Sequence, residues 1–333
     1  MKIIETRRLM IRPQALSDAE DLFHNVFCDA EVARFMRWTP CANVEEQRAI
    51  MQRMMDARGT GASYHWSVVL KEEGRAIGAV GASAQIEADR RADLGYCLGR
   101  AYWGRGLMAE ALEAAIHCLL FDAGFNRVEA YHAVQNPASG AVMRKAGMFR
   151  EGRARQKFHC AEGFVDAELY GLVREDLFHP APFTGFLDAG ELRDGELALS
   201  CVERQPERPD IGYVPAYLFE MRVDGVRAGE ISLRIGMTDS LYYGGQIGYN
   251  VEPAFRGRGF AGRGCKLLLP LIRRHGFRSV LITNDPANAA SRRVCEKIGA
   301  RMVRVAELPE GHDLYKQGQR RGCIWVWDVN GAG

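Results

Sequence analysis

Residues 247–259 read IGYNVEPAFRGRG, and residues 94–106 read LGYCLGRAYWGRG. In each stretch an alternating apolar segment leads into a Gly-Arg-Gly turn, and a helix-like apolar run follows. The glycines that the two stretches share, each pair 153 positions apart, are Gly95 and Gly248, Gly104 and Gly257, and Gly106 and Gly259. A strand, a glycine turn and a helix are therefore predicted twice in one chain.

The repeat continues beyond the glycine turns. Asn136-Pro-Ala-Ser139 matches Asn288-Ala-Ala-Ser291 at a spacing of 152 positions. Solenoid repeats have periods of only ~20–50 residues, so a period this long indicates two copies of a whole domain.

The length of 333 residues is sufficient for two domains that each bury a core. We expect an N-terminal domain at 1–178 and a C-terminal domain at 184–330. Two prolines between Phe178 and Phe183 interrupt a helix-like ending and mark the expected boundary.

The first copy mixes strands with helices and predicts an α+β domain. Apolar residues at helical spacing after the first glycine turn indicate a helix with one buried face. The expected strands are 7–12, 64–71, 75–82, 93–98, 127–134, 149–155 and 166–173, and the expected helices begin at Asp18, span 45–57 and 107–123, and run from Pro137 to Gly147.

The second copy matches the first from about residue 217 onward, with strands expected near 217–223, 228–235, 246–251 and 279–284. Residues 184–216 are rich in charges and prolines and read as loops, without a pair of amphipathic helices. Pro270 lies inside the expected main helix and predicts a kink there.

Composition excludes several classes of protein. The net charge of +2 gives no basic excess for nucleic acid, and no apolar run is long enough for a bilayer. The nine cysteines show no C-x-x-C and no paired spacing with histidine, so we expect reduced thiols, no metal site and a cytoplasmic protein. The sequence leaves the oligomeric state open.

The Gly-Arg-Gly turn predicts an anion site. Glycines let the backbone approach a ligand, and the N–H groups at the start of the following helix suit phosphates. Two other interpretations remain: a plain loop-to-helix turn, and a dinucleotide fingerprint, since Gly257-x-Gly259-x-x-Gly262 fits G-x-G-x-x-G. The fingerprint belongs at the first strand–helix turn of a parallel sheet, whereas here several antiparallel-looking strands come first.

These residues resemble the GNAT superfamily of acyl-CoA-dependent N-acetyltransferases, whose pyrophosphate loop reads Arg/Gln-x-x-Gly-x-Gly/Ala. Arg256-Gly-Arg-Gly259-Phe-Ala261 matches every position, whereas Trp103-Gly-Arg-Gly106-Leu-Met108 departs at both ends. The tryptophan resembles the branch that acetylates ribosomal-protein N-termini and small amines, as do Thr6-Arg-Arg-Leu9-Met-Ile-Arg12 and Glu110-Ala111.

The resemblance implies a mostly antiparallel sheet flanked by helices, present as two tandem copies, in which two neighbouring strands splay apart around acetyl-CoA. The cofactor-binding residues that it indicates are Tyr96, Cys97, Leu98, Trp103, Gly104, Arg105, Gly106, Leu107, Met108 and Asn136 in the first copy, and Tyr249, Asn250, Val251, Arg256, Gly257, Arg258, Gly259, Phe260, Ala261 and Asn288 in the second.

For catalysis the resemblance indicates Asp93 as a proton relay and Ser139 and Ser291 near the cofactor sulfur. A helix N-cap is the structural alternative for Ser139. Many relatives use a tyrosine acid where this chain has Met143 and Cys295, so that mechanism is in doubt. Gln246 replaces Asp93 in the second copy, and His275 is expected as a cation at a helix end.

The leading hypothesis is an acetyl-CoA-dependent N-acetyltransferase. Its acceptor is a primary amine, either a protein N-terminus or a small molecule such as an aminoglycoside-like drug. The acidic residues Asp18, Glu20, Asp21, Asp29 and Glu31 attract a cationic amine or form a solvated helix face. The alternatives are an acyl-CoA sensor or scaffold with one or both copies inactive, and a dinucleotide-dependent oxidoreductase.

Overall fold

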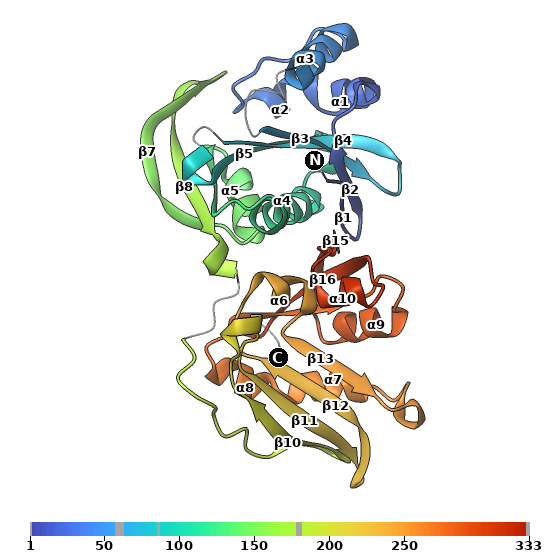
Figure 1. The fold of residues 1–333 in the computed structure, drawn as a ribbon. Helices are drawn as coiled ribbons and strands as arrows, with labels where there is room; N and C mark the ends of the chain where they lie inside the picture. The colour runs from blue at the N-terminus through green and yellow to red at the C-terminus, as the bar shows by residue number, and fades with distance from the viewer. Residues whose placement is uncertain (1, 57–62, 85–86, 178–181, 331–333) are drawn as a thin grey trace. The chain divides into compact units, whose positions relative to one another are not determined.

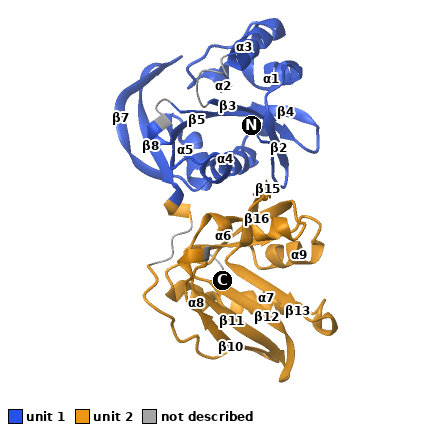
Figure 2. Ribbon diagram, in the orientation of Figure 1, with its two compact units in different colours: residues 1–174 blue, residues 175–333 orange. Residues whose placement is uncertain are grey.

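The computed structural model describes residues 2–56, 63–84, 87–177 and 182–330. The chain forms two compact units, residues 1–174 and 175–333 (Figure 2). Residues 178–181 of the expected boundary segment and residue 57 of the expected helix lie outside the described residues. No helix in the described part of the chain is long and apolar enough to cross a membrane.

The sheet of the first unit has the strand order β7-β8-β6-β5-β4-β3-β2-β1. Every pairing is antiparallel except that of β5 with β6, which is parallel. This confirms the expected α+β class. The strands are β1 (Ile4–Glu5), β2 (Leu9–Pro13), β3 (Ser63–Leu70), β4 (Arg75–Ser83), β5 (Arg91–Leu98), β6 (Arg127–Ala133), β7 (Phe149–Cys160) and β8 (Gly163–Val173).

Helices cover both faces of this sheet (Figure 1). On one face lie α1 (Ala19–Leu22), α2 (Ala30–Ala33) and α3 (Val44–Asp56), and on the other lie α4 (Leu107–His117) and α5 (Pro137–Lys145). The expectation of a single buried face on α4 is wrong, because all of its residues except Glu110 are buried.

The second unit repeats the strand order of the first, as β15-β16-β14-β13-β12-β11-β10-β9. Its core is built on aromatic residues of the sheet, among them Tyr217, Phe219, Trp325 and Trp327. The strands are β9 (Leu192–Asp194), β10 (Leu197–Gln205), β11 (Ala216–Val223), β12 (Val226–Arg234), β13 (Ile247–Val251), β14 (Ser279–Asn284), β15 (Arg301–Glu307) and β16 (Arg321–Asp328), and the helices are α6 (Asp239–Gly244), α7 (Phe260–Leu267), α8 (Leu269–Arg274), α9 (Ala289–Lys297) and α10 (Asp313–Lys316).

Two expectations for the second unit meet different outcomes. The loop expected over 184–216 is wrong in part, because β9 and β10 form an antiparallel hairpin within it. The kink at Pro270 is confirmed, since the main helix is interrupted at Leu268 between α7 and α8.

In the first unit an ion pair fastens the β1–β2 hairpin to α4. Arg8 Nε donates to Glu110 Oε2 at 2.7 Å, and Thr6 Oγ1 donates to Glu110 Oε1 at 2.6 Å. Arg8 Nη1 also donates to the carbonyl of Arg105, at 2.9 Å. The hairpin therefore holds the glycine turn in place.

The second unit makes the corresponding contact with the charges exchanged. Arg263 of α7 stands 153 positions after Glu110, and it bonds Asp194 at 2.6 Å and Glu196 at 2.7 Å in the β9–β10 hairpin. The hairpin of the second unit thus corresponds to β1–β2. Between β10 and β11 the chain has only a short 3-10 turn, Pro209–Ile211, where the first unit has α1–α3.

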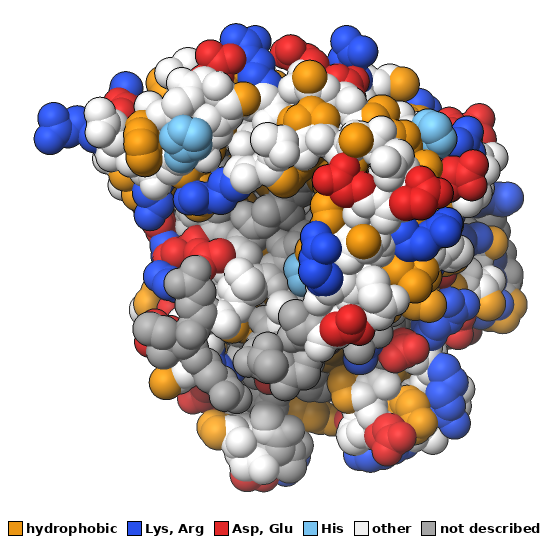
Figure 3. Space-filling model, turned by 90° about the horizontal axis from the view of Figure 1, so that it is seen from above, with side chains coloured by type: hydrophobic (Ala, Val, Ile, Leu, Met, Phe, Trp, Pro, Cys, Tyr) orange, Lys and Arg blue, Asp and Glu red, His pale blue; other side chains and the backbone are white. Residues whose placement is uncertain are grey.

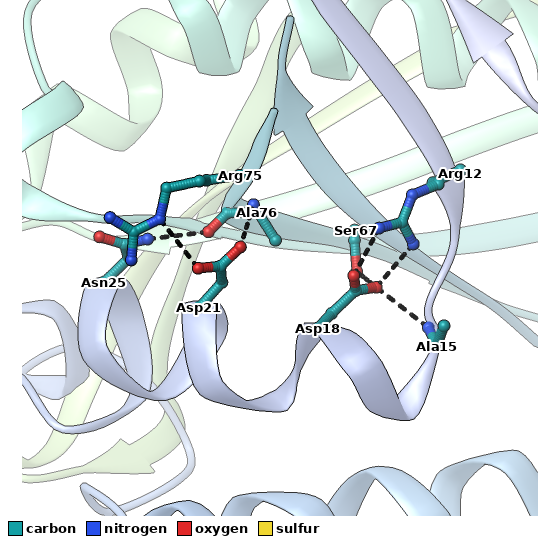
Figure 4. Close-up of polar contacts among 8 residues, drawn as sticks. All are labelled: Arg12, Ala15, Asp18, Asp21, Asn25, Ser67, Arg75 and Ala76. Atoms are coloured by element: carbon teal, nitrogen blue, oxygen red, sulfur yellow. Dashed lines mark hydrogen bonds and ion pairs between the residues drawn. The ribbon is translucent and has the colours of Figure 1, made fainter. Parts of the chain in front are cut away.

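Carboxylates of the α1 region fasten this segment to the sheet (Figure 4). Asp18 is 3% exposed, accepts two hydrogen bonds from Arg12 at 2.8 and 2.5 Å, and accepts one from Ser67 at 2.7 Å. Asp21 pairs with Arg75 at 2.9 Å and accepts from the N–H of Ala76.

The interpretation of these acids as a solvated helix face is wrong for Asp18. Burial alone would raise the pKa of Asp18, but the hydrogen bonds from Arg12, the Ala15 N–H and Ser67 together lower it below its usual value. The carboxylate therefore stays ionised inside the protein.

Candidate active site

Strands β5 and β6 part after a short parallel contact. Their ladder joins Arg91, Ala92 and Asp93 to Arg127–Glu129. Residues 94–98 of β5 continue along β4 without a ladder pair to β6. The expected splay of two neighbouring strands is therefore present, and the β6 side of β5 is open at Tyr96–Leu98.

The glycine turn after β5 requires left-handed backbone. Gly104 and Gly106 have φ of +74° and +70°, and their counterparts Gly257 and Gly259 have +78° and +83°. A Cβ at Gly104, Gly257 or Gly259 would meet no protein atom within 4 Å. The turns thus have the same shape in both units and open space beside them, which fits the backbone approach that a phosphate needs.

The first residue of each turn makes the same hydrogen bond by different chemistry. Trp103 Nε1 donates to the carbonyl of Leu98 at 2.7 Å, and Arg256 Nε donates to the carbonyl of Val251 at 2.9 Å. Both bonds reach back five residues and tie the turn to the strand end. The tryptophan, which departs from the arginine pattern, therefore keeps the arginine's structural role.

A cavity of about 400 Å³ lies against the turn of the first unit. It brings together residues that are far apart in the sequence, from β5, the turn, α4 and α5. Of the cofactor residues expected in the first copy, only Arg105 is absent from the lining of this cavity. The guanidinium of Arg105 packs on the ring of Tyr102. The predicted residues that line this cavity are Tyr96, Cys97, Leu98, Trp103, Gly104, Gly106, Leu107, Met108, Asn136 and Ser139.

A tyrosine–serine pair inside this cavity was not expected from the sequence. The hydroxyl of Tyr96 donates to the carbonyl of Ser139 at 2.9 Å and lies 2.8 Å from Ser139 Oγ. The second unit has the same pair, with Tyr249 Oη 2.9 Å from Ser291 Oγ. Burial raises the pKa of Tyr96 and of Tyr249, so both phenols stay protonated at neutral pH.

Ser139 is not the cap of α5, so the structural alternative for it is wrong. Asn136 is the N-cap and accepts from the Ser139 N–H at 3.3 Å. Asn288 caps α9 in the same way and accepts from the Ser291 N–H at 3.0 Å. Each serine thus lies in the first turn of its helix, with its hydroxyl beside a tyrosine hydroxyl.

Asp93 lies where β5 and β6 part. It is the last residue of β5 that pairs with β6, opposite Glu129. By strand alternation it shares a face with Gly95 and Cys97. It lines neither the cavity against the turn nor a second cavity on the other side of the sheet.

A second cavity, of about 390 Å³, lies on the helix α1–α3 side of the sheet. It shares Met36, Tyr96 and Cys97 with the first cavity, so the two meet at β5. Its other walls come from the α2–α3 segment, α3 and strands β3–β5. Among the described residues that line it there is no Asp, Glu, Lys or Arg.

The remaining expected residues of the second unit surround its own turn. Tyr249, Asn250 and Val251 belong to β13, while Phe260 and Ala261 are buried at the start of α7. Arg258 packs on the ring of Phe260, with its guanidinium carbon 4.8 Å from the centroid.

His275 does not act as the expected cation. It is 6% exposed and lies 2.9 Å from the hydroxyl of Tyr217. Burial lowers its pKa, so the imidazole is neutral at pH 7.

The two positions at which the resemblance would place a tyrosine acid are buried. Met143 is 1% exposed and Cys295 is 0% exposed. Burial raises the pKa of Cys295 to about 12, and it raises the pKa of Cys97, at the junction of the two cavities, to the same value. Neither thiol is a thiolate at neutral pH. In the described part of the chain no group of three His, Cys, Asp or Glu could hold a metal ion.

Comparison with known proteins gives consistent matches. The family model described as "Acetyltransferase (GNAT) domain" matches residues 8–149 and 191–301. An uncharacterized N-acetyltransferase, p20, of Bacillus licheniformis is 28% identical over 176 residues, which are 53% of this chain and 98% of that protein. The [ribosomal protein uS5]-alanine N-acetyltransferase of Escherichia coli is 30% identical over 117 residues, which are 35% of this chain and 60% of that protein. A solved ribosomal-protein-S5-alanine acetyltransferase from Vibrio fischeri is 20% identical with a TM-score of 0.48, over 53% of this chain and 98% of that one.

Proposed function

The chain belongs to the acetyltransferase (GNAT) domain family, and from this premise we propose that its first unit transfers an acetyl group from acetyl-CoA to a primary amine. The observation that carries this proposal is the meeting of two cavities at Tyr96 and Cys97. One cavity contains the glycine turn and the other lies across β5. A thioester in the first and an amine in the second would meet at the strand between them.

The residues of the first cavity fit acetyl-CoA. Left-handed Gly104 and Gly106 expose backbone N–H groups at the start of α4, where phosphates bind well. The side of β5 that has no ladder pair at Tyr96–Leu98 offers strand hydrogen bonds to an extended ligand arm, apart from the Leu98 carbonyl, which accepts from Trp103. Bound acetyl-CoA supplies the thioester that is cleaved.

The proposed reaction moves two protons. The amine nitrogen bonds to the acetyl carbon as the carbon–sulfur bond breaks, the nitrogen loses one proton and the sulfur gains one. Tyr96 and Ser139 form the proton donor, because both hydroxyls line the cofactor cavity and the phenol stays protonated. Asp93 is the proposed acceptor of the amine's proton, because it shares a strand face with Gly95 and Cys97, which line the second cavity. The protonated Cys97 favours direct attack over an acyl-enzyme.

For the second unit we propose acyl-CoA binding without acetyl transfer. Its turn and its Tyr249–Ser291 pair reproduce those of the first unit. It has Gln246 where the first unit has Asp93, and only a 3-10 turn where the first has α1–α3. The cofactor half of the site is therefore repeated, and the acceptor half is not.

Calorimetric titration with acetyl-CoA, combined with an assay of free thiol release across a panel of primary amines, tests both proposals. We expect two equivalents of acetyl-CoA per chain and thiol release that depends on an amine. Asp93→Asn and Ser139→Ala should lower kcat by about 10²-fold or more while leaving acetyl-CoA affinity unchanged. Absence of acetyl-CoA binding contradicts the assignment of both turns, and full activity in both variants contradicts the proposed proton route.

A further inference from the structure

Two facing glycines form part of the second cavity. Gly81 of β4 pairs with Gly95 of β5, and both line the cavity. A Cβ built on Gly95 would meet no atom within 4 Å, and one on Gly81 would make only ordinary contacts, beginning at 3.6 Å. The missing side chains leave room above the strand next to Tyr96.

Most residues that line this cavity are apolar, and its polar lining residues are Gln14, Thr39, Gln47 and His65. Phe27, Met36 and Trp38 come from the segments around α2, and Met51 and Met54 come from α3. Methionine side chains adapt to irregular apolar shapes, and an indole offers a large flat surface. With no Asp or Glu among its described lining residues, the cavity offers no carboxylate to pair with a second cationic group.

Four acidic residues of the segment around α1 and α2 are paired with arginines. Asp29 pairs with Arg100 at 3.0 Å, and Glu31 with Arg34 at 3.6 Å, in addition to the pairs of Asp18 and Asp21. On the face seen in Figure 3, acidic and basic side chains are interspersed. These four carboxylates therefore offer a polycationic amine little uncompensated negative charge.

In the second unit the space that corresponds to the one beside Gly95 is filled. Gly248 is the counterpart of Gly95 and pairs with Ser232. A Cβ on Gly248 would lie 3.1 Å from Ser232 Oγ and 3.3 Å from Arg234 Nη1. The side chain of Arg234, held by a bond to the carbonyl of Gly245, thus occupies the space that is open in the first unit. The room beside Gly95 is therefore a property of one copy and does not follow from the shared fold.

We propose that the second cavity of the first unit holds the apolar group of the acetyl acceptor, which is a primary amine with a single basic nitrogen and an uncharged, apolar substituent. This inference rests on the proposed function of the same unit. The substituent lies over Gly81 and Gly95 against the methionines and Trp38, and it directs the amine towards Tyr96 and Cys97, where the two cavities join. An apolar free amine and a peptide with an apolar N-terminal residue share this chemistry.

The test compares four acceptors on the whole chain: 2-phenylethylamine, a peptide with N-terminal phenylalanine, the same peptide with N-terminal serine, and spermidine. We expect kcat/KM for the better of the two apolar acceptors to exceed that of spermidine and of the serine peptide by about tenfold or more. The ratio of kcat/KM for 2-phenylethylamine to that for the phenylalanine peptide shows whether the acceptor is a free amine or a peptide N-terminus. Calorimetric binding of that acceptor to the CoA-saturated protein gives a readout independent of turnover.

A substitution tests the location. Gly95→Val should raise KM for the apolar acceptor by about tenfold, because the new side chain projects into the cavity, and it should leave acetyl-CoA affinity unchanged. Gly152→Val is the matched control, since Gly152 lies in β7, lines neither cavity, and has no atom within 4 Å of an added Cβ. It should leave KM unchanged.

The outcomes separate this inference from the proposed function. Preference for spermidine or for the serine peptide, or an unchanged KM in Gly95→Val, overturns the apolar acceptor and leaves acetyl transfer standing. If acetyl-CoA binds but none of the amines tested supports thiol release, the proposed function is wrong, and this inference is wrong with it.

Discussion

Replacing Asp18 by asparagine should loosen α1 and also α3, which packs against α1 and walls the second cavity. The carboxylate is 3% exposed and accepts two hydrogen bonds from Arg12, one from Ser67 and one from the Ala15 N–H. Asparagine has one acceptor oxygen and places an N–H₂ group against the guanidinium. Each carboxylate oxygen accepts one bond from Arg12, so at least one of these bonds is lost together with the negative charge. Removing one partner of a buried ion pair costs roughly 3–5 kcal/mol.

Hydrogen exchange of backbone amides, followed by mass spectrometry, measures this loss where it should occur. Since 1.4 kcal/mol is about a tenfold change in an equilibrium, protection in 19–22 and 44–56 should fall by at least about 10²-fold. Peptides covering α7 and α8 in the second unit serve as an internal control and should not change. Asp21→Asn is the matched variant, because Asp21 and Arg75 are 28% and 53% exposed and such pairs contribute only about 0.2–1 kcal/mol.

The pH dependence gives a second, independent check. Asp18 has a lowered pKa in the folded protein, so its contribution is complete above the unfolded value of about 3.9 and disappears as the pH falls through the folded pKa. The difference in protection between wild type and Asp18→Asn should therefore be constant at neutral pH and narrow below about pH 4. This account of Asp18 would be refuted if Asp18→Asn lost no more protection than Asp21→Asn. It would also be refuted if the difference in protection between wild type and Asp18→Asn did not change with pH.

Three further changes test the cofactor side. Trp103→Phe removes the hydrogen bond to Leu98 and should weaken acetyl-CoA binding at the first unit by about fivefold, or roughly 1 kcal/mol. Trp103→Arg should restore the wild-type affinity. If calorimetry gives the wild type and Trp103→Phe the same affinity, the hydrogen bond does not contribute to binding. Tyr96→Phe should lower kcat by about 10²-fold. Because burial raises the pKa of this phenol, the kcat of the wild type should not fall near pH 10, where a free tyrosine ionises. A fall of kcat at alkaline pH that Tyr96→Phe abolishes would contradict the raised pKa. Gly259→Ala strains left-handed backbone by about 1–2 kcal/mol and should remove one of two equivalents of bound acetyl-CoA; unchanged stoichiometry would place no ligand at that turn.

Local features of the fold could be predicted, and features set by tertiary contact could not. The glycine turns and the Pro270 kink have local causes, since φ near +80° needs glycine and proline lacks an N–H. The β9–β10 hairpin escaped prediction because most of β10 is exposed and its sequence lacks an apolar alternation. The near-complete burial of α4 depends on the sheet and helices around it.

The tyrosine–serine pair also had no sequence signal. Tyr96 and Ser139 are 43 residues apart, and they meet only because β5 and β6 part beside the capped start of α5. Each residue alone fits an ordinary strand or helix start. The recurrence of the same two residue types as Tyr249 and Ser291 was visible in the alignment of the copies, and it was the one signal that could have indicated the pair.

The differences between the two units are concentrated on the acceptor side. On the cofactor side, Trp103 and Arg256 make one hydrogen bond by two chemistries, and Glu110 and Arg263 fasten the first hairpin with opposite charges. Substitutions that change a residue but keep its contact are expected where both copies need the same backbone arrangement. Beside Gly248, by contrast, Arg234 fills the space. If both units bind acyl-CoA and only the first admits an amine, selection would preserve the turn twice and the open cavity once, which is the pattern that these residues form.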